Sequence, residues 1–137
     1  LNMHHIVVPG MVERQSGKVI NIASDAGRVG SSGEAVYSAC KGGLIAFTKT
    51  LAREVARNGI CCNAVAPGPV DTPLLRSMIP DGNLEGGLGK AFQKAIPMRR
   101  LGEPSDIPGI VAFLASQDSD YITGQIISVS GGLTMHG

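Results

Sequence analysis

"GKVINIASDAGRVGSSGEAVYSACK", residues 17–41, is the stretch that decides the fold of this chain. It begins with a short β-branched apolar run, Val19, Ile20 and Ile22, which is typical of a strand buried in a parallel sheet. The glycine- and serine-rich segment 25–35 then predicts a loop. A helical pattern starts directly after it. The stretch therefore indicates the strand, loop and helix that open a βαβ unit.

The helix after the loop is predicted over residues 36–58. Its apolar residues recur at spacings of three and four, and Gly59 stands where a left-handed cap residue belongs. A second buried strand is predicted near Cys61–Ala66, and it ends at Pro67 and Gly68. The apolar positions of the helix are Val36, Cys40, Leu44, Phe47, Leu51 and Val55.

The alternation of helix and strand continues on both sides of this unit. Residues 4–15 predict the last turns of a helix, although Pro9 disfavours helix there. Residues 103–116 predict an apolar helix with a cap at its start. A third strand is predicted near Gln125–Val129. We expect an α/β fold in which three parallel strands are covered by helices, with apolar side chains left on one edge of the sheet.

The segment Val70–Gly102 differs from the rest of the chain. It contains prolines, the glycine-rich run "DGNLEGGLG" and little apolar periodicity. This pattern predicts a mobile flap with short helices, and we interpret residues 70–102 as a substrate flap within a single domain, residues 1–137.

Composition favours some classes of partner over others. A net charge of +1 without a long basic run disfavours nucleic acid. The sequence contains no run of about 18 apolar residues, which a membrane-spanning helix needs. It also shows no signal-peptide pattern. The cysteines Cys40, Cys61 and Cys62 suit neither a disulfide framework nor a zinc site, so we expect reduced thiols, a cytoplasmic protein and no metal. Cys40 is expected to be a small packing residue.

Three polar residues predict chemistry at the carboxyl edge of the sheet. Tyr37 and Lys41, four residues apart, share one face of the predicted helix. A nearby ammonium stabilises a phenolate and so lowers the pKa of a tyrosine. Ser24 ends the first strand, where open α/β sheets bind ligands. We expect Ser24 to orient a carbonyl oxygen, Tyr37 to exchange its proton and Lys41 to tune Tyr37. Taken alone, Tyr-x-x-x-Lys more often marks a solvated helix face, but the flanking strands favour the catalytic interpretation.

These motifs resemble the short-chain dehydrogenase/reductase family, and the resemblance covers nearly the whole chain. It implies a Rossmann-type doubly wound parallel sheet. It also implies an oxidoreductase that acts on a CH–OH group with NAD or NADP, NAD being favoured. The residues that carry it are Ser24 at the strand end, Tyr37 and Lys41 of "YxxxK", and Pro67, Gly68 and Thr72 of "PGxxxT".

The family resemblance also implies roles for individual residues. The catalytic residues would be Ser24, Tyr37 and Lys41, and the lysine would also hold the nicotinamide ribose. The residues after the "PG" strand would meet the nicotinamide carboxamide. The implied assembly is a homo-oligomer, a tetramer built on the tyrosine-bearing helix and the last strand. The implied cofactor-binding residues are Tyr37, Lys41, Pro67, Gly68, Val70 and Thr72.

Within the family, the chain looks most similar to 2-hydroxycyclohexanecarboxyl-CoA dehydrogenases, and next to 3-oxoacyl-acyl-carrier-protein reductases. The segments that indicate the first subgroup are "MVERQSGK", "SDAGRVGSSGEAVY" and "SVSGGLTMHG". The substrate implied is a hydroxyacyl or oxoacyl thioester. The alternating charges of "REVARN", residues 53–58, favour a CoA thioester over an acidic carrier protein.

The sequence departs from the family in one respect. The "TGxxxGxG" turn and the "NNAG" segment, which serve the dinucleotide site, do not occur in it. We therefore expect the C-terminal half of such an enzyme, with the family's catalytic asparagine upstream of Leu1. The alternative is a catalytically silent remnant or subunit that folds only with partner chains. The choice between NAD and NADP stays open.

Overall fold

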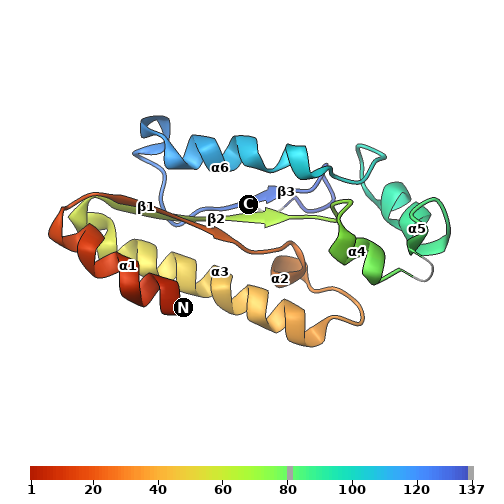
Figure 1. Cartoon of the computed structure of the whole chain (residues 1–137), viewed down its shortest axis with the longest axis horizontal. Coiled ribbons are helices and arrows are strands. Elements are labelled where there is room, and N and C mark those ends of the chain that lie inside the picture. The colour runs from red at the N-terminus through yellow and green to blue at the C-terminus, as the bar shows by residue number, and fades with distance from the viewer. Residues whose placement is uncertain (80–81, 136–137) are drawn as a thin grey trace.

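A parallel three-stranded sheet forms the centre of the molecule (Figure 1). The computed structural model describes residues 1–79 and 82–135. Strands β1 (Gly17–Ile22), β2 (Ile60–Pro67) and β3 (Ile126–Val129) lie in the order β1-β2-β3, and both pairs are parallel. The predicted α/β fold with three parallel strands and covering helices is confirmed.

The helices cover both faces of this sheet. Helices α1 and α3 lie on one side and α6 lies on the other (Figure 1). Helices α2, α4 and α5 lie toward the end to which the arrowheads of β2 and β3 point. The helices are α1 (Asn2–Glu13), α2 (Ala26–Val29), α3 (Ala35–Val55), α4 (Pro73–Ser77), α5 (Gly87–Ala95) and α6 (Pro108–Ala115), with short 3₁₀ turns η1 (Ala56–Asn58), η3 (Pro104–Asp106) and η4 (Gln117–Ser119).

The main core lies between β1, β2 and the second half of α3. Val19, Leu51, Val55 and Ile60 are all buried there, and the apolar residues in the second half of α1 pack against them. Full burial of each such side chain stabilises the fold by about 1.5–3 kcal/mol. This packing accounts for the continuous helix α1, which runs through Pro9 although the sequence disfavoured helix at that residue.

Helix α3 ends as its sequence predicts. Gly59 has φ of 68°, the left-handed conformation of a helix cap, directly after the 3₁₀ turn η1. A Cβ at this position would also lie 2.6 Å from the carbonyl oxygen of Gln15. Both the conformation and the close approach therefore require glycine.

The segment 25–35, predicted as a loop, differs from its prediction because it contains the helical turn α2. The flap, described here without its residues 80 and 81, has the predicted short helices, α4 and α5. It also has a small core of its own, in which Ile79, Leu84, Ile96 and Leu101 are buried. Because these residues come from separate segments, they show no helical or strand period in the sequence.

The three cysteines lie in contrasting environments. Cys61 and Cys62 are buried in β2, and burial raises the pKa of the Cys62 thiol to about 11. Cys40 is exposed, so the prediction that it packs was wrong. The reason is that the buried residues of α3 all lie in its second half, and Val36 in the first half is 78% exposed.

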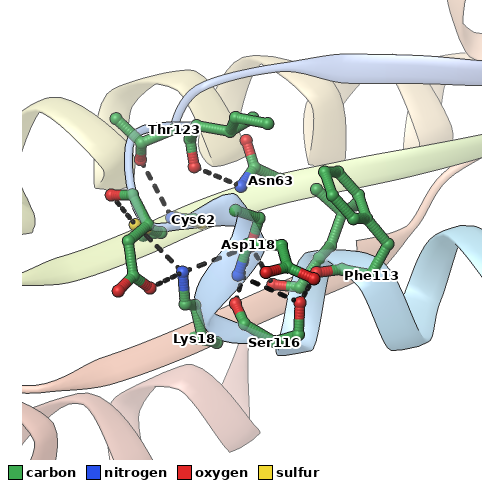
Figure 2. A network of polar contacts seen from close by, with 12 residues as sticks. Lys18, Cys62, Asn63, Phe113, Ser116, Asp118 and Thr123 are labelled. Atoms are coloured by element: carbon green, nitrogen blue, oxygen red, sulfur yellow. Dashed lines mark hydrogen bonds and ion pairs between the residues drawn. The ribbon is translucent and has the colours of Figure 1, made fainter.

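A polar network fixes the end of the sheet where the strands begin (Figure 2). Lys18 Nζ lies 2.7 Å from Asp120 Oδ1 and donates to Ser119 Oγ at 3.2 Å. The fully buried amide of Asn63 donates to the carbonyl of Ile122 at 2.8 Å. These bonds hold the connection that leads into β3.

Among the described residues no helix is long and apolar enough to cross a membrane.

Candidate active site

The carboxyl ends of the strands open into a pocket of about 780 Å³. Residues from the ends of β1 and β2, from α2, from the start of α3 and from the flap line it. The pocket brings together every residue predicted for the catalytic and cofactor sites: Ser24, Tyr37, Lys41, Pro67, Gly68, Val70 and Thr72.

Ser24 lies in the turn that leads from β1 into α2. Its Oγ accepts a hydrogen bond from the backbone N–H of Ala26 at 3.2 Å, and its carbonyl oxygen accepts one from Gly27 at 3.0 Å. A hydroxyl has one proton and two lone pairs. The Ser24 hydroxyl can therefore donate its proton to a ligand in the pocket while its oxygen accepts the bond from Ala26.

Tyr37 and Lys41 lie one turn apart near the start of α3. The Lys41 Nζ is 5.7 Å from the centroid of the Tyr37 ring, so the two side chains share one space as the four-residue spacing predicts. The same Nζ donates to the carbonyl oxygen of Ile22 at 2.8 Å, which ties α3 to the end of β1. The Tyr37 side chain is 37% exposed and its phenol is open to a ligand.

The turn after β2 closes tightly on the last strand. The N–H of Gly68 donates to the carbonyl of Val129 at 3.0 Å. A Cβ at Gly68 would lie 2.7 Å from Cβ of Ser130, so a side chain does not fit without displacement. Gly68 thus lets the backbone after β2 approach the backbone after β3 closely.

The entrance of the flap is fixed on both sides. Val70 forms a parallel bridge with Gly102, the two ends of the predicted flap. Thr72 caps α4 by accepting from the N–H of Leu75 at 3.2 Å. Asp71 accepts two bonds of 2.7 Å from Arg76, a structural pairing rather than the environment of a free general acid.

A second ion pair closes the far end of the flap. Hydrogen bonds from Arg100, and then from the backbone of Glu103, lower the pKa of Asp106 to about 2. Glu103 and Asp106 form a capping box at η3. Pro104, between the two residues of this capping box, and Ile107, directly after it, line the pocket.

Asp25 is the pocket residue that sequence reasoning missed. Its side chain is 4% exposed, and Ser128 Oγ donates a short hydrogen bond to its Oδ1. Arg28 in turn donates to Ser128 Oγ at 2.8 Å. The only sequence signal was a carboxylate next to the predicted catalytic serine, because its partner on β3 lies about a hundred positions away in the chain.

His4 has a structural role. Its Nε2 donates to Asn21 Oδ1 at 2.7 Å, and its ring meets the Phe47 ring edge-on at 4.8 Å between centroids. His5 is exposed on the same helix. No group of three or more His, Cys, Asp or Glu side chains that could hold a metal occurs in residues 1–79 and 82–135.

Comparison with known proteins shows that the chain is similar to reductases of acyl thioesters. The family described as "Enoyl-(Acyl carrier protein) reductase" matches residues 1–134. The chain is 44% identical over 126 residues to an acetoacetyl-CoA reductase from Acinetobacter sp. (strain RA3849), covering 92% of this chain and 48% of that protein. It is 39% identical over 134 residues to a 3-oxoacyl-[acyl-carrier-protein] reductase from Thermotoga maritima, covering 98% of this chain and 52% of the relative.

A solved structure shows the same arrangement. The 3-oxoacyl-[acyl-carrier protein] reductase from Brucella melitensis superposes with a TM-score of 0.84 at 37% identity, over 98% of this chain and 48% of that one. A second structure of such a reductase from the same organism, with bound NAD, gives a TM-score of 0.82 at 37% identity, over 98% of this chain and 47% of that one. The chain thus spans about half the length of these relatives. None of these four relatives is named as a 2-hydroxycyclohexanecarboxyl-CoA dehydrogenase.

Proposed function

Because the chain belongs to the short-chain dehydrogenase/reductase family, we propose that it carries the catalytic site of an NAD(P)-dependent oxidoreductase. The observation that carries the proposal is that Ser24, Tyr37 and Lys41 all line the same pocket at the strand ends. The reaction is hydride transfer between a secondary alcohol or ketone and the cofactor. We assign residues 70–102 as the substrate flap of this single, partial Rossmann-type domain.

The residues at the pocket floor suit the nicotinamide end of such a cofactor. Gly68 lines the pocket with backbone atoms alone, which suits contact with a flat ring. We assign the carboxamide contacts to Pro67, Gly68, Val70 and Thr72, and the ribose contacts to Tyr37 and Lys41. A bound nicotinamide supplies or accepts the hydride.

The chain's own residues handle the oxygen and the proton. Ser24 and Tyr37 donate hydrogen bonds to the substrate oxygen while negative charge develops on it. Tyr37 then gives its proton to that oxygen in reduction, or takes it in oxidation. Lys41, whose ammonium is 5.7 Å from the Tyr37 ring centroid, stabilises the phenolate left behind.

We propose a hydroxyacyl or oxoacyl thioester as substrate. The relatives support this class, since one of them is a human (3R)-3-hydroxyacyl-CoA dehydrogenase, 45% identical over 119 residues, 87% of this chain and 43% of that protein. The apolar flap residues Leu74, Met78 and Phe92 line the pocket and suit an acyl group. Our specific candidate is the alicyclic 2-hydroxycyclohexanecarboxyl-CoA, with NAD as cofactor. A cytoplasmic homo-tetramer is part of the same proposal.

Turnover assays test this function. The chain is joined to the amino-terminal half of the Brucella melitensis reductase, and oxidation of NADH and NADPH is followed with acetoacetyl-CoA, 2-oxocyclohexanecarboxyl-CoA and an acetoacetyl carrier protein. We expect reduction of the CoA esters, faster with NADH. No turnover with any thioester or cofactor, in a folded protein that binds NADH, would refute the proposal.

One observation favours the alternative of a silent subunit. Strand β1 is an edge of the sheet and its Ile22 is 45% exposed, while Leu1, Met3 and Ile6 of the α1 region are each more than 65% exposed. These surfaces suit a covering segment or chain. A chain that folds only when a partner is added, and that never turns over, would support the alternative.

A further inference from the structure

We infer that the hydrogen-bond chain from Arg28 through Ser128 to Asp25, called here the Asp25 relay, positions Ser24 for the reaction. Asp25 and Ser128 are then positioning residues of the enzyme. The inference rests on the proposed function and deepens it by naming what holds the catalytic serine in place.

The relay joins the turn that carries Ser24 to the last strand. Asp25 directly follows Ser24 and is 4% exposed. Its Oδ1 accepts a short hydrogen bond from Ser128 Oγ on β3. Arg28 Nη1 donates to Ser128 Oγ at 2.8 Å and to the carbonyl of Ile126 at 3.0 Å. These bonds attach the turn between β1 and α2 to β3, although β1 pairs with β2 and not with β3.

The chemistry of the three groups fixes the direction of the relay. A guanidinium can only donate hydrogen bonds, and an ionised carboxylate can only accept them. The hydroxyl of Ser128, which can do both, is therefore the required link. Within the described residues the other oxygen of Asp25, Oδ2, is buried without a hydrogen-bond partner. Loss of the Ser128 hydroxyl would leave a buried carboxylate without its side-chain donor, a costly state that is relieved when the carboxylate moves.

Movement of Asp25 would be transmitted to both sides of the site. Helix α2 has only four residues, so its position depends on tertiary contacts rather than on its own stability. On one side the N–H of Asp25 donates to the carbonyl of Pro67 at 3.0 Å. On the other side a Cβ at Gly27 would lie 2.6 Å from the carbonyl carbon of Lys41, so α2 rests directly on the backbone of the catalytic lysine. The relay is the third contact, and it sets the rotation of α2 between these two.

A set of serine variants tests the relay. Ser128→Ala removes the hydroxyl, Ser128→Thr keeps it, and Ser105→Ala removes an exposed hydroxyl that bonds to Glu103 and does not line the pocket. In the joined enzyme we expect Ser128→Ala to lower kcat roughly tenfold to hundredfold with little change in KM, since misplacement by about 1 Å can cost about 10²-fold. Ser128→Thr should restore kcat, and Ser105→Ala should match the parent.

A second readout does not depend on turnover. The amide N–H groups of Ala26 and Gly27 donate to Ser24, so their NMR signals report the position of this serine. We expect both signals to shift in Ser128→Ala and to return in Ser128→Thr.

The outcomes separate the relay from the proposed function. Unchanged amide signals, or a kcat within about twofold of the parent alongside a lower melting temperature, would overturn the relay, because a purely structural residue gives that pattern. If the parent turns over no thioester, the proposed function fails, and the amide signals alone decide whether the relay positions Ser24.

Discussion

Replacement of Tyr37 by phenylalanine is the sharpest test of the site. Within the described residues the Tyr37 hydroxyl makes no hydrogen bond, and the side chain is 37% exposed. The substitution removes one oxygen, keeps the ring above Lys41 and leaves no buried group unpaired. The free energy of unfolding should therefore change by no more than about 0.5 kcal/mol, as for a surface position without special contacts.

The effect on catalysis should be of a different size. The lost hydroxyl is the group proposed to pass the proton, and general acid–base catalysis is worth about 10²–10⁴-fold. Steady-state turnover of the joined enzyme, together with thermal unfolding followed by circular dichroism, measures both quantities on the same samples. A Tyr37→Phe protein that retains more than about a tenth of the parent kcat would show that Tyr37 is only part of a helix face.

Three further predictions concern the surroundings of the site. Gly68→Ala brings a Cβ to 2.7 Å from Cβ of Ser130 and should lower the free energy of unfolding by about 1–3 kcal/mol, measured by urea titration; an unchanged midpoint would contradict the tight turn. The pKa of Asp106 is lowered to about 2, so its pairing with Arg100 stabilises the fold above the ordinary carboxyl pKa near 4, and this contribution is lost as the pH falls toward 2. Melting temperatures of the parent and of Asp106→Asn should therefore converge at low pH, and a constant difference would refute the pairing. Amide exchange should be faster in residues 82–102 than in β1, because the flap has only a small core, and equal protection would show that the flap is not a mobile element.

The sequence predicts correctly those parts of the fold that depend on residues close together in the chain. The β-branched run at Val19–Ile22, the spacing along α3 and the glycine at 59 each depend on neighbouring residues, and each appears in the structure where expected. The same holds for the pocket, because the carboxyl ends of parallel strands meet on one edge and bring Ser24 and Gly68 together.

The parts that the sequence does not predict depend on distant partners. The Asp25 relay joins residues 25 and 128, and neither position shows a pattern that names the other. The flap core brings together Leu84 and Leu101 from either side of helix α5, so it shows no period. The exposure of Cys40 depends on how far the sheet extends beneath α3, which helical spacing does not specify.

The different exposure of the three thiols also allows the chain to be labelled at a single site. Cys61 and Cys62 are shielded inside β2, and the Cys62 thiol, with its pKa of about 11, is almost entirely unreactive at neutral pH. Cys40 stands alone on the surface, between Tyr37 and Lys41 on α3. A thiol-reactive fluorophore will therefore label one position, without engineered cysteines, directly beside the pocket. Its emission would report the arrival of a ligand in the pocket.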